Sequence, residues 1–295
     1  MDMGGATDPR ERSWEVDGLR FAGLEWGPER GLPVLALHGW MDHAGSFAEL
    51  APRLEGCRVV ALDLSGHGLS GHRAAHATYN IWDDLPQIAG LLEQLGWRSC
   101  VLVGHSRGAI ISGLVAATMP DRVRALVSLD SLAPYPHEAD AVETLAAFVE
   151  ETRKQAARGP RRFVDVEDYV RRRSAQGNSP ESSRALAGRA LEKTADGFVL
   201  RGDSRLFASS AMKLTRPQVE ELLRAIRCPV LNIWAEEGSL AARPRSAEIA
   251  KLGAELIADY VRADLPGDHH FHMDPEVAGP MADTILDFLR RRLQG

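Results

Sequence analysis

The segment Gly104-His105-Ser106-Arg107-Gly108 lies between a short apolar run, residues 99–103, and a longer apolar stretch of helical character, residues 109–117. This context predicts a strand, a tight turn and a helix, with Ser106 on the turn. The two glycines allow neighbouring backbone to approach closely, so that the serine hydroxyl projects above the sheet. A serine hydroxyl is a poor nucleophile until a base takes its proton. The rest of the chain must therefore supply a base, an acid that orients it, and donors for the negative charge that develops.

A histidine-rich loop near the C-terminus supplies the predicted base. Residues 259–265 predict a late strand, a Gly-Asp turn follows, and His269 stands directly after that turn. A histidine at the end of a strand far downstream of the serine matches the chain order serine, acid, histidine. We therefore predict His269 as the base, with His270 and His272 as weaker candidates. We predict no metal ion and no organic cofactor, because no further ligands accompany these histidines.

Four segments together resemble the α/β-hydrolases and, within that superfamily, the serine hydrolase-like proteins. They are LHGWMDHAGSF at residues 37–47, ALDLSGHGLS at residues 61–70, the serine turn, and GDHHFHM at residues 267–273. The similarity covers roughly residues 33–134 and 228–293 and is weak between them. We assign structural hydrogen bonds, rather than chemistry, to three polar residues of the second segment. These are Asp63, His67 and Ser70.

The resemblance also implies two backbone donors for the negative charge on a reacting carbonyl oxygen. A short apolar run, residues 32–37, ends in His38-Gly39-Trp40, where this fold has its donor loop. The implied donors are the N–H groups of Trp40 and of Arg107, the residue after the serine.

The orienting acid is where the chain departs from the family pattern. Many α/β-hydrolases carry an aspartate after the next-to-last predicted strand, at a position that is Gly238 here. Two alternatives stay open: Glu236 or Glu237 could reach the histidine, or the acid could lie one strand earlier, at Asp130. A carboxylate that ends the apolar run at residues 123–129 is costly to bury without a partner, and imidazolium is a suitable one. We favour Asp130.

Arg107 is a second departure, because relatives usually carry an apolar residue or a glutamine after the serine. Its guanidinium adds a fixed positive charge beside the reacting group. It could bind an anionic part of the substrate or pair with Asp130 or Glu236, and we favour the pairing.

Apolar runs that alternate with helix-like stretches predict a mainly parallel, eight-stranded α/β sheet with helices on both faces. Residues 14–26 predict a hairpin that leads into it. Residues 134–227 have helical spacing and no strand signal, which predicts a helical cap inserted after the sixth strand. The core then comprises residues 1–133 and 228–295. Such a cap would close a substrate pocket. The predicted pocket walls are Trp40, Tyr135 and Phe271.

Composition excludes several classes of partner. The net charge of −6 argues against a nucleic-acid partner. Residues 1–12 lack the apolar core of a secretory signal, and no run is long enough to span a bilayer. Three cysteines, Cys57, Cys100 and Cys228, begin predicted buried strands and suggest a reducing cytoplasm. The oligomeric state stays open.

The predicted function is hydrolysis of a small carboxylic ester through an acyl-enzyme, with Ser106, His269 and Asp130 as the triad. Thioester, lactone and carbon–carbon bond hydrolysis and cofactor-free perhydrolase activity stay as alternatives, because fold alone does not separate them. A ligand-binding protein of the same fold without catalysis is the alternative from another class. A serine at the turn disfavours dehalogenase and epoxide hydrolase chemistry, which uses a carboxylate nucleophile in relatives of this fold.

Overall fold

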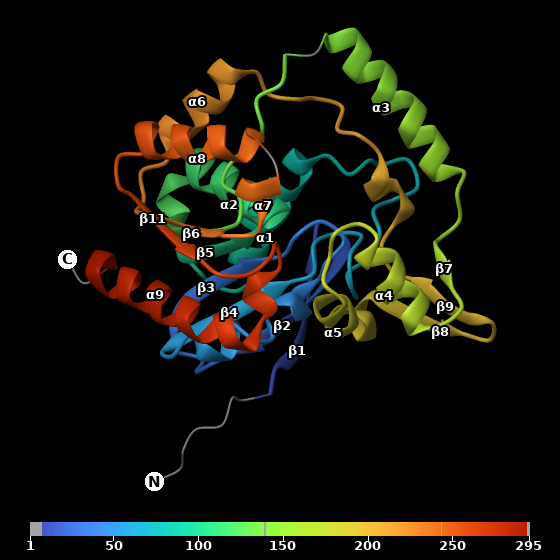
Figure 1. Ribbon diagram of the computed structural model, residues 1–295, viewed down its shortest axis with the longest axis horizontal. Helices are drawn as coiled ribbons and strands as arrows, with labels where there is room; N and C mark the ends of the chain where they lie inside the picture. Colours follow the sequence, from blue (N-terminus) through green and yellow to red (C-terminus); the bar gives the residue numbers. More distant parts are fainter. Residues whose placement is uncertain (1–7, 139, 243, 294–295) are drawn as a thin grey trace.

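In the computed structural model, an eight-stranded sheet forms the centre of the molecule (Figure 1). The structure describes residues 8–138, 140–242 and 244–293. In sheet order, the strands are β1 (Arg10–Val16), β2 (Leu19–Trp26), β4 (Cys57–Leu62), β3 (Leu32–Leu37), β5 (Cys100–His105), β6 (Val123–Leu129), β10 (Val230–Ala235) and β11 (Tyr260–Leu265). The β1–β2 and β2–β4 pairs are antiparallel, and the other neighbours run parallel. The predicted hairpin and the mainly parallel sheet are confirmed.

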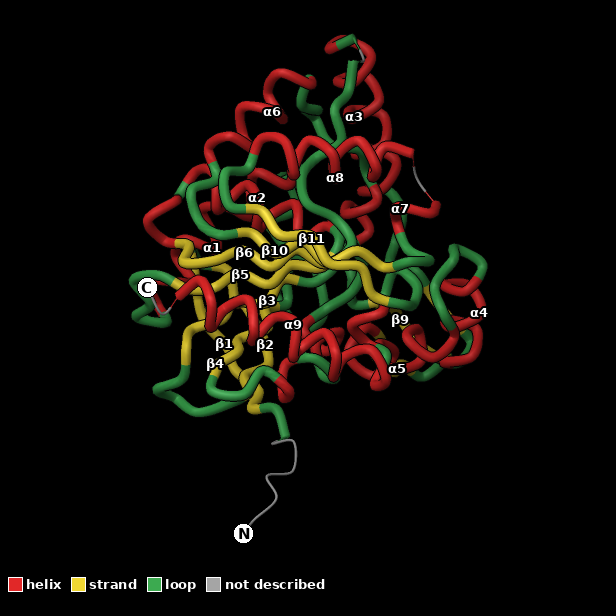
Figure 2. Tube along the Cα trace, turned by 60° about the vertical axis from the view of Figure 1, so that its left-hand side comes forward, coloured by secondary structure: helices red, strands yellow, loops and turns green. Residues whose placement is uncertain are grey.

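Helices cover both faces of this sheet (Figure 2). The helices of one face are α1 (Asp84–Gln94), α2 (Arg107–Thr118), α6 (Arg216–Ala225) and α8 (Pro244–Leu256), and α9 (Pro275–Leu293) covers the other. Because side chains alternate along a strand, Leu35 joins the first apolar cluster and Val34 the second. Burial on both faces explains why the strands are continuous apolar runs. The shorter helical turns are η1 (Ala44–Phe47), η2 (Ala51–Arg53), η3 (Ile81–Asp83), η4 (Pro120–Arg122), η5 (Ser204–Phe207), η6 (Phe271–Met273) and α7 (Ser239–Ala242).

The segment between β6 and α6 combines helices with a small second sheet. Its elements are α3 (Ala141–Ala156), β7 (Arg162–Phe163), α4 (Val166–Ser174), α5 (Pro180–Ala190), β8 (Leu191–Thr194) and β9 (Gly197–Leu200). The three strands pair antiparallel in the order β7-β9-β8. The prediction that this segment contains no strand is therefore wrong. Strands of two to four residues are too short to show an alternating pattern against a helical background.

The end of the predicted insertion, residues 134–227, packs with the core. Val219 and Leu223 of α6 are buried in the same apolar cluster as Ile111 of α2 and Ile249 of α8. We therefore use the name insertion for the part before α6, which lies to one side of the sheet in Figure 1.

Buried polar contacts fasten the insertion to the core. Asp42 accepts a hydrogen bond from Arg173 of α4 at 2.9 Å, and the carboxylate of Asp63 accepts one from Arg189 of α5 at 2.8 Å. Asp63 also accepts from the backbone N–H groups of Ala44 and Leu69. These contacts agree with the structural role assigned to Asp63.

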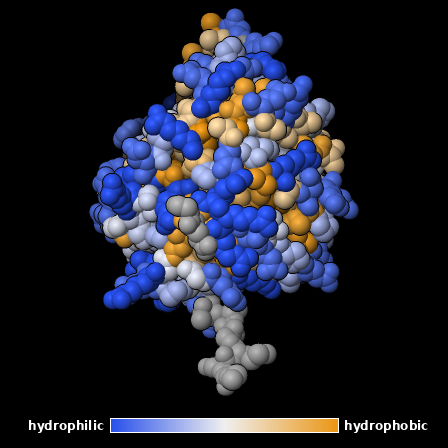
Figure 3. Space-filling model, turned by 90° about the vertical axis from the view of Figure 1, so that its left-hand side faces the viewer, coloured by the Kyte–Doolittle hydropathy of each residue, from blue (hydrophilic) through white to orange (hydrophobic). Residues whose placement is uncertain are grey.

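The surface carries no large apolar area on the face that Figure 3 shows. That face is mostly hydrophilic, with hydrophobic residues in small separate patches. Within the described ranges, no helix is long and apolar enough to cross a membrane. The three cysteines are free and buried, which agrees with their prediction as small core residues.

Candidate active site

Ser106 stands on a strained turn between β5 and α2. Its backbone angles, φ 51° and ψ −114°, are rare for a residue with a side chain. A Cβ atom at Gly108 would lie 1.9 Å from the carbonyl oxygen of Leu37, and one at Gly104 would lie 2.4 Å from that of Gly108. Both glycines are therefore required by close backbone approach, and the predicted strand, turn and helix are confirmed.

The structure brings Ser106, His269 and Asp130 together. The Nε2 atom of His269 lies 2.9 Å from the hydroxyl of Ser106, and its Nδ1 atom lies 2.6 Å from Oδ2 of Asp130. A carboxylate only accepts, so the contact assigns the imidazole hydrogen to Nδ1 and leaves the lone pair of Nε2 toward the hydroxyl. Such an arrangement can take a proton from Ser106 and stabilise the imidazolium that results.

Asp130 is fixed in place by the ends of two neighbouring elements. It follows β6 with φ 50°, is fully buried, and accepts hydrogen bonds from the backbone N–H groups of Ala235 at 3.2 Å and Ser239 at 2.8 Å. A Cβ atom at Gly238 would lie 2.6 Å and 2.7 Å from its two carboxylate oxygens. The carboxylate from β6 therefore fills the space that a side chain at position 238 would need.

The alternative acids lie elsewhere. Glu236 and Glu237 are exposed, and no hydrogen bond described here joins either of them to His269. Of the two weaker base candidates, His270 contacts Asp42 at 3.1 Å, and His272 is buried with both ring nitrogens unpartnered in the described chain. Neither histidine replaces His269 beside Ser106.

The two predicted backbone donors belong to Arg107, which follows the serine, and to Trp40, which lines the cavity. Arg107 is the first residue of α2, so its N–H has no acceptor within the helix. Trp40 follows β3 and lines the same cavity as Ser106. Its indole donates to the carbonyl oxygen of Leu206 at 3.1 Å, which ties the donor loop to the insertion.

The guanidinium of Arg107 pairs with Asp84 at 2.7 Å, so the predicted pairing with Asp130 or Glu236 is wrong. Asp84 is the first residue of α1 and is almost fully buried. Its carboxylate also forms an ion pair with Arg73 at 2.9 Å. Burial raises the pKa of the Asp84 carboxyl, and the two guanidiniums oppose that rise. No local sequence pattern predicts this contact, because it joins the first residue of α1 to a residue 23 positions away.

Replacement of Arg107 by methionine should therefore test stability rather than chemistry. Removing one partner of a buried ion pair is strongly destabilising, but Arg73 still neutralises Asp84, so we expect the free energy of unfolding to fall by about 2 kcal/mol. Urea denaturation measures this. Ester turnover should change less than about threefold, because the proposed donor is the backbone N–H. A loss of about 100-fold in a folded variant would instead assign the guanidinium to the reaction.

A cavity of about 810 Å³ opens at Ser106 and His269, between the core and the insertion. Trp40 lines it as predicted, but Tyr135 and Phe271 do not. The hydroxyl of Tyr135 contacts Ser246 at 2.8 Å, and Phe271 is buried in the apolar cluster beneath α9. Proximity in sequence to the acid and the base did not determine which way these rings point.

The insertion contributes charged side chains to the cavity that the sequence analysis missed. These are Arg161, Arg162, Arg172 and Arg173, which lie beside the aromatic residues Phe163, Tyr169 and Phe207. Arginines interspersed with aromatic residues are the signal that could have revealed them.

The α/β hydrolase fold family model matches residues 33–276. The chain belongs to the α/β-hydrolase fold family. The match covers most of the chain and includes every residue of the site described above, from the donor loop to His269.

Several proteins are similar to this α/β-hydrolase over nearly its full length. A serine hydrolase-like protein of Dictyostelium discoideum is 30% identical over 287 residues, which cover 92% of this chain and 79% of that protein. The crystal structure of a hypothetical protein from Pseudomonas aeruginosa PAO1 has 37% identity and a TM-score of 0.88, covering 95% of this chain and 99% of the other. The thioesterase domain from the curacin biosynthetic pathway has 27% identity and a TM-score of 0.80, covering 95% and 100%.

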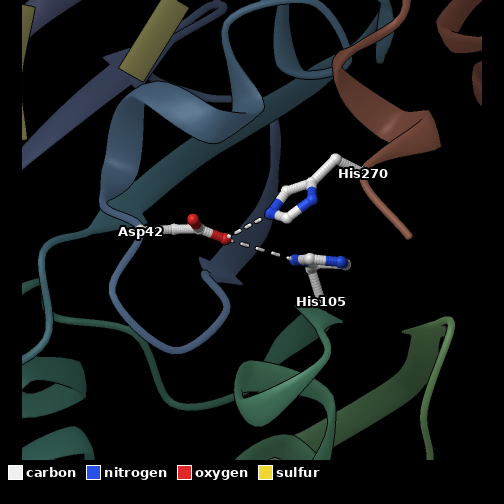
Figure 4. A group of neighbouring side chains, drawn as sticks. All are labelled: Asp42, His105 and His270. Carbon is white, nitrogen blue, oxygen red and sulfur yellow. Dashed lines mark hydrogen bonds and ion pairs between the residues drawn. The ribbon is translucent and has the colours of Figure 1, made fainter. Parts of the chain in front are cut away.

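One group of side chains in this hydrolase has the composition of a metal site. The ligand atoms of Asp42, His105 and His270 lie within 4.8 Å of one another and are buried (Figure 4). A carboxylate and two imidazoles suit zinc. However, the Asp42 carboxylate already forms an ion pair with Arg173 at 2.9 Å, which neutralises its charge. It also contacts Nε2 of His270 at 3.1 Å. The absence of a metal from the mechanism stays a prediction.

The same group connects the serine turn to the histidine loop. The Nε2 atom of His105 lies 2.7 Å from the carbonyl oxygen of His269, and burial lowers the pKa of His105 well below its ordinary value. A neutral imidazole that donates from Nε2 leaves Nδ1 without a hydrogen, toward Asp42 at 3.7 Å. The residue before Ser106 thus holds the backbone of His269.

Proposed function

We propose that this hydrolase cleaves a small carboxylic ester through an acyl-enzyme, with Ser106 as nucleophile, His269 as base and Asp130 as the orienting acid. The observation that carries this proposal is the continuous path from the Ser106 hydroxyl to His269 at 2.9 Å and from His269 to Asp130 at 2.6 Å. Nucleophile, base and orienting carboxylate in contact are the signature of covalent acyl transfer.

In the proposed first step, His269 takes the hydroxyl proton as Ser106 attacks the ester carbonyl carbon. The oxygen of the tetrahedral intermediate carries the negative charge, and the N–H groups of Trp40 and Arg107 donate to it. When the bond to the alcohol oxygen breaks, the imidazolium gives its proton to that leaving oxygen. Asp130 stabilises the imidazolium and keeps its hydrogen on Nδ1 throughout.

In the second step, His269 takes a proton from a water molecule that attacks the acyl carbon. The carbon–oxygen bond to Ser106 breaks, the serine oxygen recovers a proton from His269, and the acid leaves. The insertion contributes half of the residues that line the cavity, so we assign substrate selection to it. A small molecule is the proposed partner, and the three free, buried cysteines favour action in the cytoplasm.

Thioester hydrolysis is the second candidate, favoured by the similarity to the curacin thioesterase domain. It needs the same groups, because only the leaving atom differs. Lactone and carbon–carbon bond hydrolysis and perhydrolase activity remain further alternatives. A binding protein without catalysis would not require Ser106, His269 and Asp130 in mutual contact.

Paired substrates separate the two leading candidates. p-Nitrophenyl esters and the corresponding acyl thioesters of graded chain length are to be compared by kcat/KM. We expect esters of short acids to be hydrolysed fastest. A thioester preferred about tenfold over the ester of the same acid would move the assignment to a thioesterase.

A further inference from the structure

Arginines form one wall of the cavity above Ser106. Arg161 precedes β7 and Arg162 is its first residue, and Arg172 and Arg173 come from the end of α4. Three acidic residues also line the cavity, all of them from the core: Asp42, Glu237 and Asp268. The charges are therefore divided, with the cations on the insertion and the anions on the core.

Two of these arginines have no carboxylate partner. Arg172 pairs with Asp168 at 2.8 Å, and Arg173 pairs with Asp42 at 2.9 Å. By contrast, no ion pair in the described ranges involves Arg161 or Arg162. Both are exposed to the cavity side of the insertion. Their charge is available to a ligand.

Arg161 is nevertheless held in position. Its guanidinium lies 3.6 Å from the centre of the Phe207 ring, within cation–π distance. Burial, together with the neighbouring Arg158 and Arg172, lowers the pKa of Arg161. Positive charge is thus concentrated at a point where no carboxylate of the described chain offsets it.

An aromatic ring of the insertion lines the same cavity. Tyr169 is 2% exposed, and its ring lies 5.8 Å from the Arg173 guanidinium. Its hydroxyl is buried away from the cavity, and Arg173 beside it opposes the rise in pKa that burial causes. Tyr169 therefore offers the cavity its ring, and the charged groups on this wall are the arginines.

We propose that Arg161 and Arg162 form a subsite for an anionic group of the substrate, a carboxylate or a phosphate. The inference rests on the proposed function, because it places the ester bond at Ser106 and the anionic group toward the insertion. Guanidinium groups bind such anions through paired, charge-assisted hydrogen bonds. Glu237 on the core side repels the anion and so favours this single orientation.

The test compares two esters that differ only in charge. They are p-nitrophenyl pentanoate and mono-p-nitrophenyl glutarate, which has a carboxylate at the far end of an acyl chain of the same length. The measured quantity is the ratio of kcat/KM for the anionic ester to that for the neutral one. In the Arg161→Gln/Arg162→Gln variant we expect this ratio to fall about 10- to 100-fold, mainly through KM of the anionic ester.

Arg171→Gln is the matched control. Arg171 is an exposed arginine of α4 that pairs with Asp168 at 2.7 Å and does not line the cavity, so the ratio should stay unchanged. Tyr169→Phe removes a hydroxyl that is buried away from the cavity, so it should also leave the ratio unchanged. Competitive inhibition by glutarate and by butyl phosphate distinguishes a carboxylate from a phosphate, and the stronger inhibitor should lose its advantage in the double variant.

A ratio that does not change in the double variant overturns the subsite. Ser106→Ala separates this failure from failure of the proposed function. If Ser106→Ala inactivates the enzyme toward both esters while the ratio is insensitive to the arginines, only the subsite is wrong. If Ser106→Ala still hydrolyses the neutral ester, the proposed function itself is wrong.

Discussion

Ser106→Ala should lose at least about 1,000-fold in kcat for p-nitrophenyl esters, together with all labelling by a fluorophosphonate probe. The reason is the geometry around the hydroxyl, which lies 2.9 Å from Nε2 of His269 on a backbone turn that few residues with side chains adopt. Alanine removes the hydroxyl that is proposed to form the acyl-enzyme and leaves the turn otherwise intact. Hydrolysis of p-nitrophenyl butyrate and gel fluorescence after labelling measure the two effects.

Ser239→Ala provides the control for Ser106. Ser239 lines the same cavity, and its hydroxyl lies 3.3 Å from Nδ1 of His269, on the far side of the ring from the nucleophile. We expect the Ser239→Ala variant to be labelled by the probe and to lose less than about tenfold in kcat. Undiminished labelling of Ser106→Ala would end the assignment of this residue as the nucleophile.

Asp130→Asn is expected to lower kcat by about 100-fold or more, with KM little changed. In a well-studied triad, the equivalent change cost about 10⁴ in turnover, because the histidine adopts the wrong tautomer. The same cause applies here, since an amide nitrogen facing Nδ1 at 2.6 Å would donate rather than accept. Glu236→Gln and Glu237→Gln, both exposed, should each change kcat less than about threefold.

A double variant tests whether the orienting carboxylate can be supplied from position 238, after β10, in place of position 130, after β6. Gly238→Asp alone should be poorly active, because a Cβ atom there meets the Asp130 carboxylate at 2.6 Å. Asp130→Gly removes the carboxylate and tolerates φ 50°. The Cβ atom of Ala235, which would lie 2.7 Å from the new Cβ, must then shift by a few tenths of an ångström. We expect Asp130→Gly/Gly238→Asp to recover at least about tenfold in kcat over Asp130→Gly. Retention of more than about a tenth of the activity in Asp130→Asn would contradict the assignment of this acid.

Residues in local patterns were predictable. Ser106 and His269 stand in short motifs whose strand and loop context is visible in the sequence, and Asp130 was favoured because a carboxylate ends an apolar strand. The fold followed from alternating apolar runs, which reflect burial on both faces of a parallel sheet.

Contacts set by tertiary packing were not predictable. Arg107 pairs with Asp84 because α1 brings that carboxylate beside the start of α2, and no local pattern encodes this meeting. Phe271 points into the core although it follows the base by two positions. The sequence around the arginines of the cavity wall has the composition of an ordinary solvent-exposed segment. Only the fold of the insertion turns these arginines toward the cavity at Ser106.

The left-handed backbone at two positions bears on how this protein evolves. Ser106 and Asp130 end adjacent strands with φ 51° and φ 50°, and each such conformation costs on the order of 1 to 3 kcal/mol unless the residue is glycine. Selection for stability alone would therefore favour glycine at both positions. Under the proposed mechanism these two side chains are the nucleophile and the orienting acid, so the chain would gain stability by losing the groups that turnover requires.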